Sequence, residues 1–360
     1  MKTKFVNRFY VIFTLLLLVA AGAACAPAGA PTTAGATANS GAQANSATIS
    51  NTNAVSGTTG SSTGGNANGG AVEVRIGYQR GGEYWNLLKA EGTLEKLFGP
   101  NVKVTWSLFA AGPPMLEALN AGAIDIGEVG ETPPIFAQAA GAPLLYVAQE
   151  ASSGAGSAIL VPADSPIKTI ADLKGKKVAF TKASSAHLLT IRALEKNGLN
   201  YSDIQPALLA PPDARAAFEG GSIDAWVIWN PFFEAAVQEL KAKILVDGAD
   251  VSPTRSYVIA ARPFVEKNPD KVLAIIDELK KAQTWSKDHV DEYAALLEKE
   301  TQLSAAVWKG AFNRERPELQ LLDDQTAIDQ QKVADIFFDL QLIPEKLDIK
   351  SVIWEGNKAK

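Results

Sequence analysis

The stretch Val74-Arg75-Ile76-Gly77-Tyr78 begins the part of the chain that decides its fold. It is a short run rich in apolar residues, so it predicts a β-strand. Residues 84–98 then predict a helix, and residues 102–108 predict a second strand. This alternation of strands and helices is typical of an α/β domain.

The alternation continues through most of the chain. A helix is expected over Pro113 to Asn120 and a strand over Ile124 to Gly127. A second series follows, with strands expected at 177–180, 206–210, 225–229 and 243–246, and helices at 186–197, 213–219 and 231–240. Two similar α/β lobes in series are therefore predicted. Ser256 to Ala261 is expected to be a strand that returns to the first lobe, followed by helices from 268 to about 340.

The N-terminal region has the pattern of an export signal. Three basic residues precede an apolar run, residues 9–24, that ends at Cys25, the only cysteine in the sequence. A cysteine after small residues resembles the end of a bacterial lipoprotein signal, which implies a signal peptide over 1–24 and lipidation of Cys25. Cleavage by the ordinary signal peptidase is an alternative. A membrane span is another, although the run is slightly shorter than the roughly 20 residues needed.

Residues 26–71 predict a disordered linker. They consist almost entirely of Gly, Ala, Ser, Thr and Asn, with only Ile49 and Val55 as larger aliphatic residues. Such a segment cannot bury enough apolar surface to offset the loss of chain entropy on folding. The single cysteine also excludes an intrachain disulfide. The N-terminal region is therefore expected to consist of a signal peptide, a lipid anchor at Cys25 and a flexible linker.

Charge and composition exclude several function classes. The formal net charge is −5, or −8 once the three basic residues of the signal are removed, which argues against nucleic acid as a partner. Only two histidines are present, so a metal centre of His and Cys is not expected. The sequence has no HExxH, CxxC, phosphate-binding P-loop or GxSxG motif, and neither an enzyme activity nor a cofactor is predicted.

Several strand-to-helix junctions share a chemistry that suits an anion. Each places a small, capping or proline residue where a helix would begin: 111–114, 131–134, 184–187, 211–213 and 230–231. Any one of them could be no more than a good helix start. Together they lie at the carboxyl ends of strands, where open α/β sheets bind ligands and free N–H groups of helix N-termini hold anions. An anion held between two lobes is therefore predicted.

Long runs of the sequence also resemble the aliphatic sulfonate-binding proteins of bacterial ABC importers, within the nitrate, sulfonate and taurine substrate-binding family. The runs are 76–79, 116–120, 132–141, 172–180, 184–187, 201–206, 213–218 and 224–229. The resemblance implies a type II, Venus-flytrap periplasmic binding protein, with a first lobe over 72–162 and 253–354 and a second lobe over 163–252. It also implies delivery of an alkanesulfonate to a permease and its ATPase for sulfur acquisition.

The resemblance implies a location and a set of cleft residues as well. The protein would be an exported monomer, held on the outer face of the cytoplasmic membrane by its lipid anchor or free in the periplasm. The family's cleft motifs fall on Gly112, Pro113, Pro114, Gly130, Glu131, Thr132, Ser184, Ser185, His187, Asp213, Arg215, Trp229 and Asn230. Three of these depart from the family pattern, which has Gln at Pro114 and Asp at Glu131 and Asn230.

These residue types suit a sulfonate, which carries one negative charge and three acceptor oxygens. Backbone N–H groups and the hydroxyls of Thr132, Ser184 and Ser185 are expected to donate to it. Arg215 would add a charge-assisted hydrogen bond, unless it is a solvated helix residue near Glu219. Of Trp226 and Trp229, which face opposite sides of one strand, one is expected in the cleft and the other in the core.

Other ligands and function classes remain as alternatives. Taurine, nitrate or a thiamine precursor are the other ligands considered, and an acid at Glu131 would favour a substrate that carries an amine. A related hydroxypyrimidine synthase would need a histidine set and catalytic thiols, which this sequence lacks. A ligand sensor would need an output domain or a receptor partner. Transport is therefore the favoured class.

Overall fold

The computed structural model describes residues 72–357 of the chain. The expected signal peptide, the anchor at Cys25 and the expected linker lie outside these residues. Within 72–357, no helix is both long enough and apolar enough to span a bilayer.

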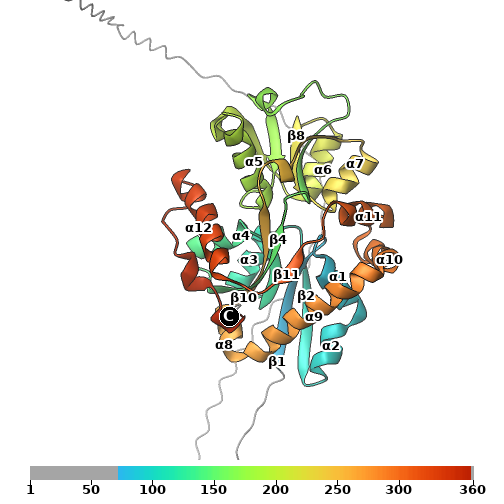
Figure 1. The fold of residues 1–360 in the computed structure, drawn as a ribbon, viewed down its shortest axis with the longest axis vertical. Coiled ribbons are helices and arrows are strands. Elements are labelled where there is room, and N and C mark those ends of the chain that lie inside the picture. The colour runs from blue at the N-terminus through green and yellow to red at the C-terminus, as the bar shows by residue number, and fades with distance from the viewer. Residues whose placement is uncertain (1–71, 358–360) are drawn as a thin grey trace, which may run out of the picture. The chain divides into compact units, whose positions relative to one another are not determined.

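The first sheet has six strands in the order β11-β4-β10-β3-β1-β2 (Figure 1). The bounds are β1 Val72–Gln79, β2 Val102–Phe109, β3 Ile126–Gly130, β4 Leu144–Ser152, β10 Thr254–Ala261 and β11 Glu318–Gln320. β1 is parallel to both β2 and β3, whereas β10 is antiparallel to β3 and β4. The prediction that the strand at 256–261 returns to the first lobe is therefore confirmed.

The second sheet has five strands in the order β7-β6-β8-β5-β9. The bounds are β5 Ser157–Val161, β6 Lys177–Phe180, β7 Gln205–Leu208, β8 Ala225–Trp229 and β9 Lys243–Asp247. Alternate residues of its strands belong to different hydrophobic clusters. On β5, for example, Ile159 and Val161 belong to one cluster, and Ala158 and Leu160 belong to the other. Because both faces of this sheet are covered at its centre, the inner strands β5, β6 and β8 are almost wholly apolar, whereas the edge strands β7 and β9 are more exposed.

Helices cover both sheets. The first lobe has α1 Glu83–Glu91, α2 Thr93–Phe98, α3 Gly112–Asn120, α4 Pro133–Ala139, α8 Arg262–Lys267, α9 Pro269–Asp288, α10 Val290–Thr301, α11 Ala305–Arg314 and α12 Asp324–Asp339. The second lobe has α5 Ser185–Lys196, α6 Pro211–Glu219 and α7 Phe232–Glu239. Short 3₁₀ turns are η1 Ile170–Leu173, η2 Tyr201–Asp203, η3 Gly248–Asp250, η4 Ile349–Val352 and η5 Glu355–Asn357. In Figure 1, α5 lies on one side of β8, and α6 and α7 lie on the other.

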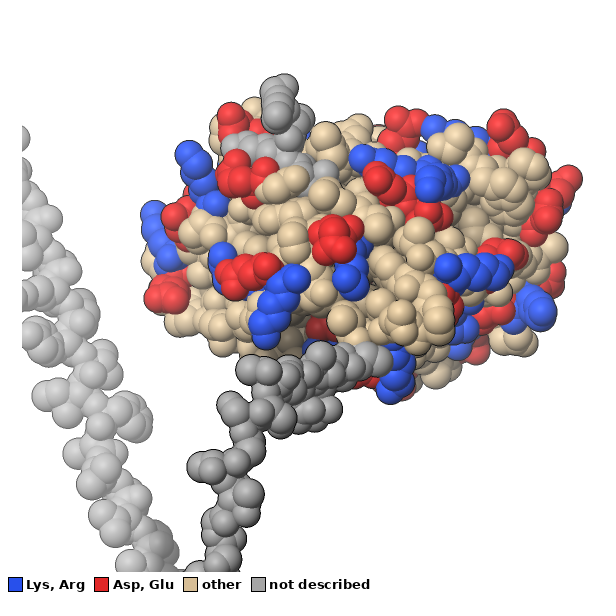
Figure 2. Space-filling model, turned by 90° about the horizontal axis from the view of Figure 1, so that it is seen from below, with Lys and Arg blue, Asp and Glu red and all other residues tan. Residues whose placement is uncertain are grey.

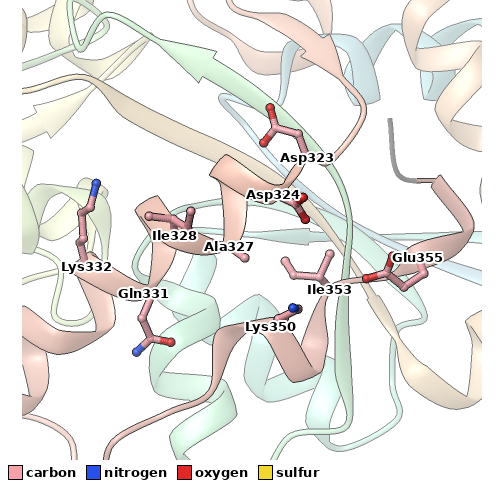
Figure 3. Close-up of a pocket in the computed structure, with 9 residues that line it drawn as sticks. All are labelled: Asp323, Asp324, Ala327, Ile328, Gln331, Lys332, Lys350, Ile353 and Glu355. Atoms are coloured by element: carbon pink, nitrogen blue, oxygen red, sulfur yellow. The ribbon is translucent and has the colours of Figure 1, made fainter. Parts of the chain in front are cut away.

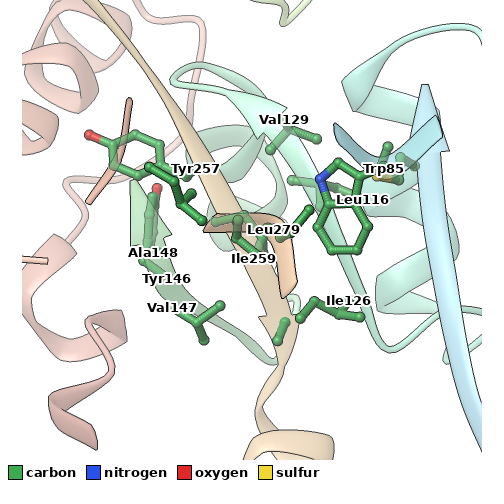
Figure 4. Close-up of a cluster of buried hydrophobic side chains, with 14 of the residues drawn as sticks. Trp85, Leu116, Ile126, Val129, Tyr146, Val147, Ala148, Tyr257, Ile259 and Leu279 are labelled. Atoms are coloured by element: carbon green, nitrogen blue, oxygen red, sulfur yellow. The ribbon is translucent and has the colours of Figure 1, made fainter. Parts of the chain in front are cut away.

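The core of the first lobe lies between its sheet and these helices (Figure 4). Tyr146 on β4 and Tyr257 on β10 pack edge to face, with ring centroids 4.8 Å apart. Trp85 on α1 is fully buried in the same cluster. This packing holds the ends of β1 and β3 in fixed positions, and the candidate site is built on those ends.

The chain passes between the sheets twice, and the first crossing corrects a predicted boundary. It lies at 153–156, between β4 and β5, whereas the sequence placed the end of the first segment at 162. The reason is that β5 pairs with β8 and β9 and so belongs to the second sheet. Glu315 stabilises this crossing by hydrogen bonds. Its Oε2 accepts from Ser152 Oγ at 2.6 Å and from Gly156 N at 3.3 Å. The return crossing lies between β9 and β10, where the expected boundary at 252/253 falls.

The helix expected over 84–98 is in fact two helices. Gly92, in the left-handed region at φ 59°, separates α1 from α2. This conformation suits glycine because glycine has no Cβ to clash with the following carbonyl. The break turns the chain, so that α1 packs against α9 and α10, while α2 also packs against β2.

Acidic and basic side chains are interspersed over the face of the molecule seen in Figure 2. Neither sign forms a large continuous area on this face. The electrostatic field there is therefore mixed, with no single direction that would steer a highly charged partner.

Candidate functional site

A cavity of about 110 Å³ lies between the two lobes. It is lined by Gln79, Gly81, Gly82, Gly112, Glu128, Val129, Gly130, Pro133, Ser184, Ser185 and Trp229. Most of these residues stand at the carboxyl ends of strands or at the first turns of the helices that follow, which is where α/β sheets bind ligands. The volume corresponds to about four water molecules. The cavity is therefore suited to a compact polar group.

The lobes come very close together at Gly130. A Cβ added to this residue would lie 2.0 Å from Ser185 Oγ and 3.2 Å from Ser185 Cβ on the other lobe. Gly112 is similarly restricted, because its Cβ would lie 2.8 Å from Pro133 Cγ. Glycine at these positions is explained by close packing around the cavity.

The N-terminus of α5 is the strongest anion-binding feature at the cavity. Ser184 has extended backbone and precedes the helix, but its hydroxyl donates to Thr181 O at 2.7 Å and so does not cap it. Within the described part of the chain, the N–H groups of Ser185 and Ala186 have no acceptor. Uncapped N–H groups and the positive end of the helix dipole favour an anion at this position.

The other two helices that begin at the cavity contribute less than the sequence suggested. α3 has Pro113 and Pro114 in its first turn, and α4 begins with Pro133 and Pro134. Proline has no N–H, so these helix starts lose donors that the predicted anion site would have used. Pro133 shapes the cavity wall and does not donate, and α5 is left as the main source of backbone N–H groups.

Four predicted residues carry buried polar atoms that lack a partner among the described residues. They are Glu131 Oε1, Thr132 Oγ1, His187 Nε2 and Asn230 Oδ1. Of these residues, Thr132 directly precedes Pro133 and Asn230 directly follows Trp229, and both Pro133 and Trp229 line the cavity. Because nearly all buried polar atoms in proteins are hydrogen-bonded, such atoms beside a cavity are available to a bound molecule.

Glu131 does not line the cavity, contrary to the prediction. Its carboxylate accepts from Arg255 N at 3.0 Å and faces a different hollow, lined by Arg192, Arg255 and Asp329. Burial raises the pKa of Glu131 to about 7, and the charges of Arg192 and Arg255 oppose this shift. Glu131 therefore bonds to the backbone of Arg255 outside the inter-lobe cavity, and the nearby arginines leave little reason to assign it to an amine of the ligand.

His187 is a core residue and does not line the cavity either. Its ring stacks on Phe180 at 5.0 Å and lies 5.6 Å from Phe337 of α12. Nδ1 accepts from Ala183 N at 3.3 Å. Burial, with a contribution from Lys182, lowers the pKa of His187 to about 4, so the ring is neutral at pH 7. Its role is to pack α5 against α12.

Four other predicted residues also lie away from the cavity. Arg215 Nε pairs with Glu219 at 2.7 Å and Nη2 pairs with Glu239 at 2.8 Å, which favours the interpretation as a helix surface residue over the guanidinium clamp. Asp213 and Pro114 are exposed, and Pro113 lines a neighbouring groove. By contrast, Trp229 lines the cavity, while Trp226 is buried against Phe218.

Sequence reasoning missed one charged residue of the cavity, Glu128 on β3. Its Oε2 accepts from Trp85 Nε1 at 3.0 Å, and its backbone carbonyl accepts from Gln79 Nε2 at 2.9 Å. Pro133 lies in the helix start at 131–134 that the sequence already indicated, and Gly81 and Gly82 lie in the stretch 81–85 after the first strand, which is expected from the sequence to shape the floor of the pocket. Gln79 and Val129 were missed as well. The available signal was their position at the carboxyl ends of β1 and β3.

A larger cavity lies elsewhere and has a different character. It measures about 500 Å³ and lies between α12 and the C-terminal segment (Figure 3). The lining residues come only from 323–355 and include both acids and lysines, so the second lobe does not contribute to it. Among residues 72–357, no group of three or more His, Cys, Asp or Glu side chains is arranged to hold a metal ion.

The sequence profile of the NMT1-like family matches residues 68–298. The chain belongs to this family. The periplasmic aliphatic sulphonate binding protein SsuA from Escherichia coli, known from a crystal structure, is 44% identical, with a TM-score of 0.72 over 79% of this chain and 98% of that one. The alkanesulfonate-binding protein SsuA from Xanthomonas axonopodis pv. citri, solved with MOPS bound, is 37% identical, with a TM-score of 0.76 over 80% and 99%.

A third relative matches over a similar share of the chain. An aliphatic sulfonates-binding protein of Bacillus subtilis (strain 168) is 34% identical over 285 residues, which are 78% of this chain and 85% of its own. The resemblance inferred from the sequence is confirmed by these matches, and so is the two-lobed α/β fold of a periplasmic binding protein.

Proposed function

We propose that this chain is the substrate-binding component of an ABC importer, which captures an aliphatic sulfonate between its lobes and delivers it to a membrane permease and its ATPase. The observation that carries the proposal is the uncapped N-terminus of α5 at the cavity, where Ser185 is the first helical residue. Its free N–H groups match the acceptor oxygens of a sulfonate. The SsuA relatives support the same ligand class.

The cavity is better suited to a monoanion than to a dianion. Among the residues that line it in the described chain, there is no Lys, Arg or His. A second negative charge would have to be desolvated without a cation to compensate for it, which is costly. A sulfonate has one charge and an alkyl group, whereas sulfate has two charges. We therefore expect the protein to discriminate between them.

Taurine, nitrate and a thiamine precursor remain as alternative ligands. The sequence-based reason for an amine-bearing ligand was Glu131, and that carboxylate is bonded to Arg255 N outside the cavity. Nitrate would satisfy the donors of α5 but would not use the indole of Trp229, which lines the same cavity. An alkyl chain packed on Trp229 accounts for both features.

A thermal-shift series tests the ligand class. At about 100 times Kd, a ligand stabilises the folded state by about 2.7 kcal/mol, so alkanesulfonates such as ethanesulfonate and MOPS should raise the melting temperature by a few degrees. Sulfate should not. An Arg215→Ala variant is a matched control, because its side chain lies outside the cavity, and it should show the same shifts. An equal shift with sulfate, or no shift with any sulfonate, would contradict the proposal.

We also propose that the chain is exported and held at the outer face of the cytoplasmic membrane through Cys25. The basic residues, the apolar run at 9–24 and the single cysteine support this. Cys25→Ser should move the protein from the membrane fraction to the soluble exported fraction, as detected by fractionation and immunoblotting. A parent protein that is already soluble, with a mature N-terminus other than Cys25, would show that lipidation does not occur.

A further inference from the structure

Glu128 is the only charged residue that lines the inter-lobe cavity in the described part of the chain. Trp85 Nε1 fixes one of its carboxyl oxygens at 3.0 Å. The second oxygen, Oε1, has no donor among residues 72–357, and the residue is half-buried. A carboxyl group with one oxygen held and one free therefore stands in the wall of a cavity that also contains the open end of α5.

Glu128 has other carboxyl groups around it and little positive charge. The carboxyl groups of Glu83 on α1, Glu128 and Glu150 on β4 interact with one another. All three also act on Tyr84 of α1 and Tyr293 of α10. The cation that acts on this group is Arg316, through Glu83. A second anion bound beside an ionised Glu128 would meet strong repulsion, because like charges close together in a poorly solvated site repel strongly.

Because the cavity is small, the repulsion between a bound anion and an ionised Glu128 would act at short range. With room for about four water molecules, a group in its wall contacts the anion itself and not a distant part of the ligand. Protonation of Glu128 favours binding of the anion in two ways. It removes the negative charge, and it converts the free oxygen into a donor for an acceptor-rich ligand.

We propose that Glu128 is a ligand-binding residue that acts as the neutral acid: its carboxyl O–H donates a hydrogen bond to a sulfonate oxygen, and capture of the anion is accompanied by uptake of one proton from solvent. The inference deepens the proposed function and rests on it. It adds that the cleft selects monoanions with acceptor oxygens through a protonated carboxyl group, in addition to the N–H groups of α5.

The pKa of Glu128 agrees with this assignment. Burial raises the pKa of Glu128 to about 7, and the hydrogen bond from Trp85 opposes the shift. The acid form thus predominates below pH 7, where affinity should be constant. Above pH 7, Glu128 must take up a proton from solvent when the ligand binds, and affinity should fall by about tenfold between pH 6 and pH 8. A sulfonate does not titrate in this range, and neither does His187, whose pKa is about 4. Glu83 does, because burial raises its pKa to about 8, and the Glu128→Gln variant distinguishes its contribution from that of Glu128.

Calorimetry on the full exported chain tests the proposal with ethanesulfonate as the probe. Titrations at pH 7.5 are run in phosphate buffer and in Tris buffer, which contain no sulfonate and differ in ionisation enthalpy. The difference between the two binding enthalpies gives the number of protons taken up on binding. The parent should take up close to one proton and lose about tenfold in affinity from pH 6 to pH 8. Glu128→Gln keeps the shape, an acceptor for Trp85 and a donor for the ligand. It should bind within about threefold of the parent at pH 6, with no pH dependence and no proton uptake.

Glu131→Gln is the matched control, because burial also raises the pKa of Glu131 to about 7 but its carboxylate faces Arg255. This variant should keep the pH dependence of the parent. Parent binding that is independent of pH, or a Glu128→Gln variant that loses most of its affinity at pH 6 while still folded, would overturn the inference. So would taurine binding that strengthens with pH and disappears in Glu128→Gln, because the carboxylate would then hold an ammonium group. Failure of every sulfonate to bind the parent at any pH would instead overturn the proposed function.

Discussion

Gly130→Val is expected to weaken alkanesulfonate binding by about 10- to 100-fold. In the structure, a Cβ at Gly130 would lie 2.0 Å from Ser185 Oγ and 3.2 Å from Ser185 Cβ, across the boundary between the lobes. A valine adds two methyl groups beyond that Cβ, so the lobes cannot approach to the observed distance. Gly130 ends strand β3, and a β-branched residue suits a strand, so each lobe should still fold.

A short series around Gly130 separates steric blocking from other effects. Gly130→Ala alone should weaken binding less than the valine, because Ser185 Oγ can rotate away from the new Cβ. Combining Gly130→Ala with Ser185→Gly removes the opposing side chain and should permit closure again, as measured by the decrease in radius of gyration with saturating ligand. Titration calorimetry gives the affinities. Parent-like binding by Gly130→Val would show that the lobes do not meet at this point in the liganded state.

Much of the fold could be predicted because local sequence and tertiary structure agree in most elements. Strands β6 and β8 have the bounds expected from their short apolar runs. The missed strands have physical explanations. β4 and β5 are buried along most of their length, so their apolar runs, 144–148 and 158–161, lack the polar alternation that marks a half-exposed strand. β11 is three residues long and is defined by its pairing with β4, which no local pattern reveals.

The candidate site could be predicted only where a residue's role follows from its position in the chain. Gly112, Gly130, Ser184 and Ser185 stand at strand ends or helix starts, and all four line the cavity. Side-chain direction is set by distant partners and was not predictable. Glu131 accepts from Arg255 N, 124 positions away in sequence. For Arg215 the sequence left two alternatives, and the pairs with Glu219 and Glu239 favour the helix-surface one. Glu128 was missed because its role depends on Trp85, which reaches it from another element.

Trp226→Ala is expected to lower the free energy of unfolding by about 3 to 5 kcal/mol, whereas Trp229→Ala should cost much less stability and mainly impair ligand binding. The two residues lie three positions apart on β8 and face opposite sides of the sheet. Trp226 is 1% exposed and packs against Phe218 at 5.9 Å, so its removal leaves a large cavity in the second lobe. Trp229 is half-buried, and its side chain forms part of the wall of the inter-lobe cavity.

The pair distinguishes core packing from ligand contact within a single strand. Trp226→Ala should lower the melting temperature by roughly 6 °C or more, while the folded fraction at low temperature binds ethanesulfonate within about threefold of the parent. Trp229→Ala should melt near the parent temperature without ligand and lose most of the stabilisation that ligand provides. Each variant serves as the control for the other, because both remove an indole from β8. Two results would contradict this assignment: a larger loss of stability in Trp229→Ala, or a larger loss of affinity in Trp226→Ala. Either result would place the wall of the cavity on the opposite face of β8. The N-terminus of α5 could not then form part of the site, because α5 packs on the face of the sheet that carries Val178, Phe180 and Val227.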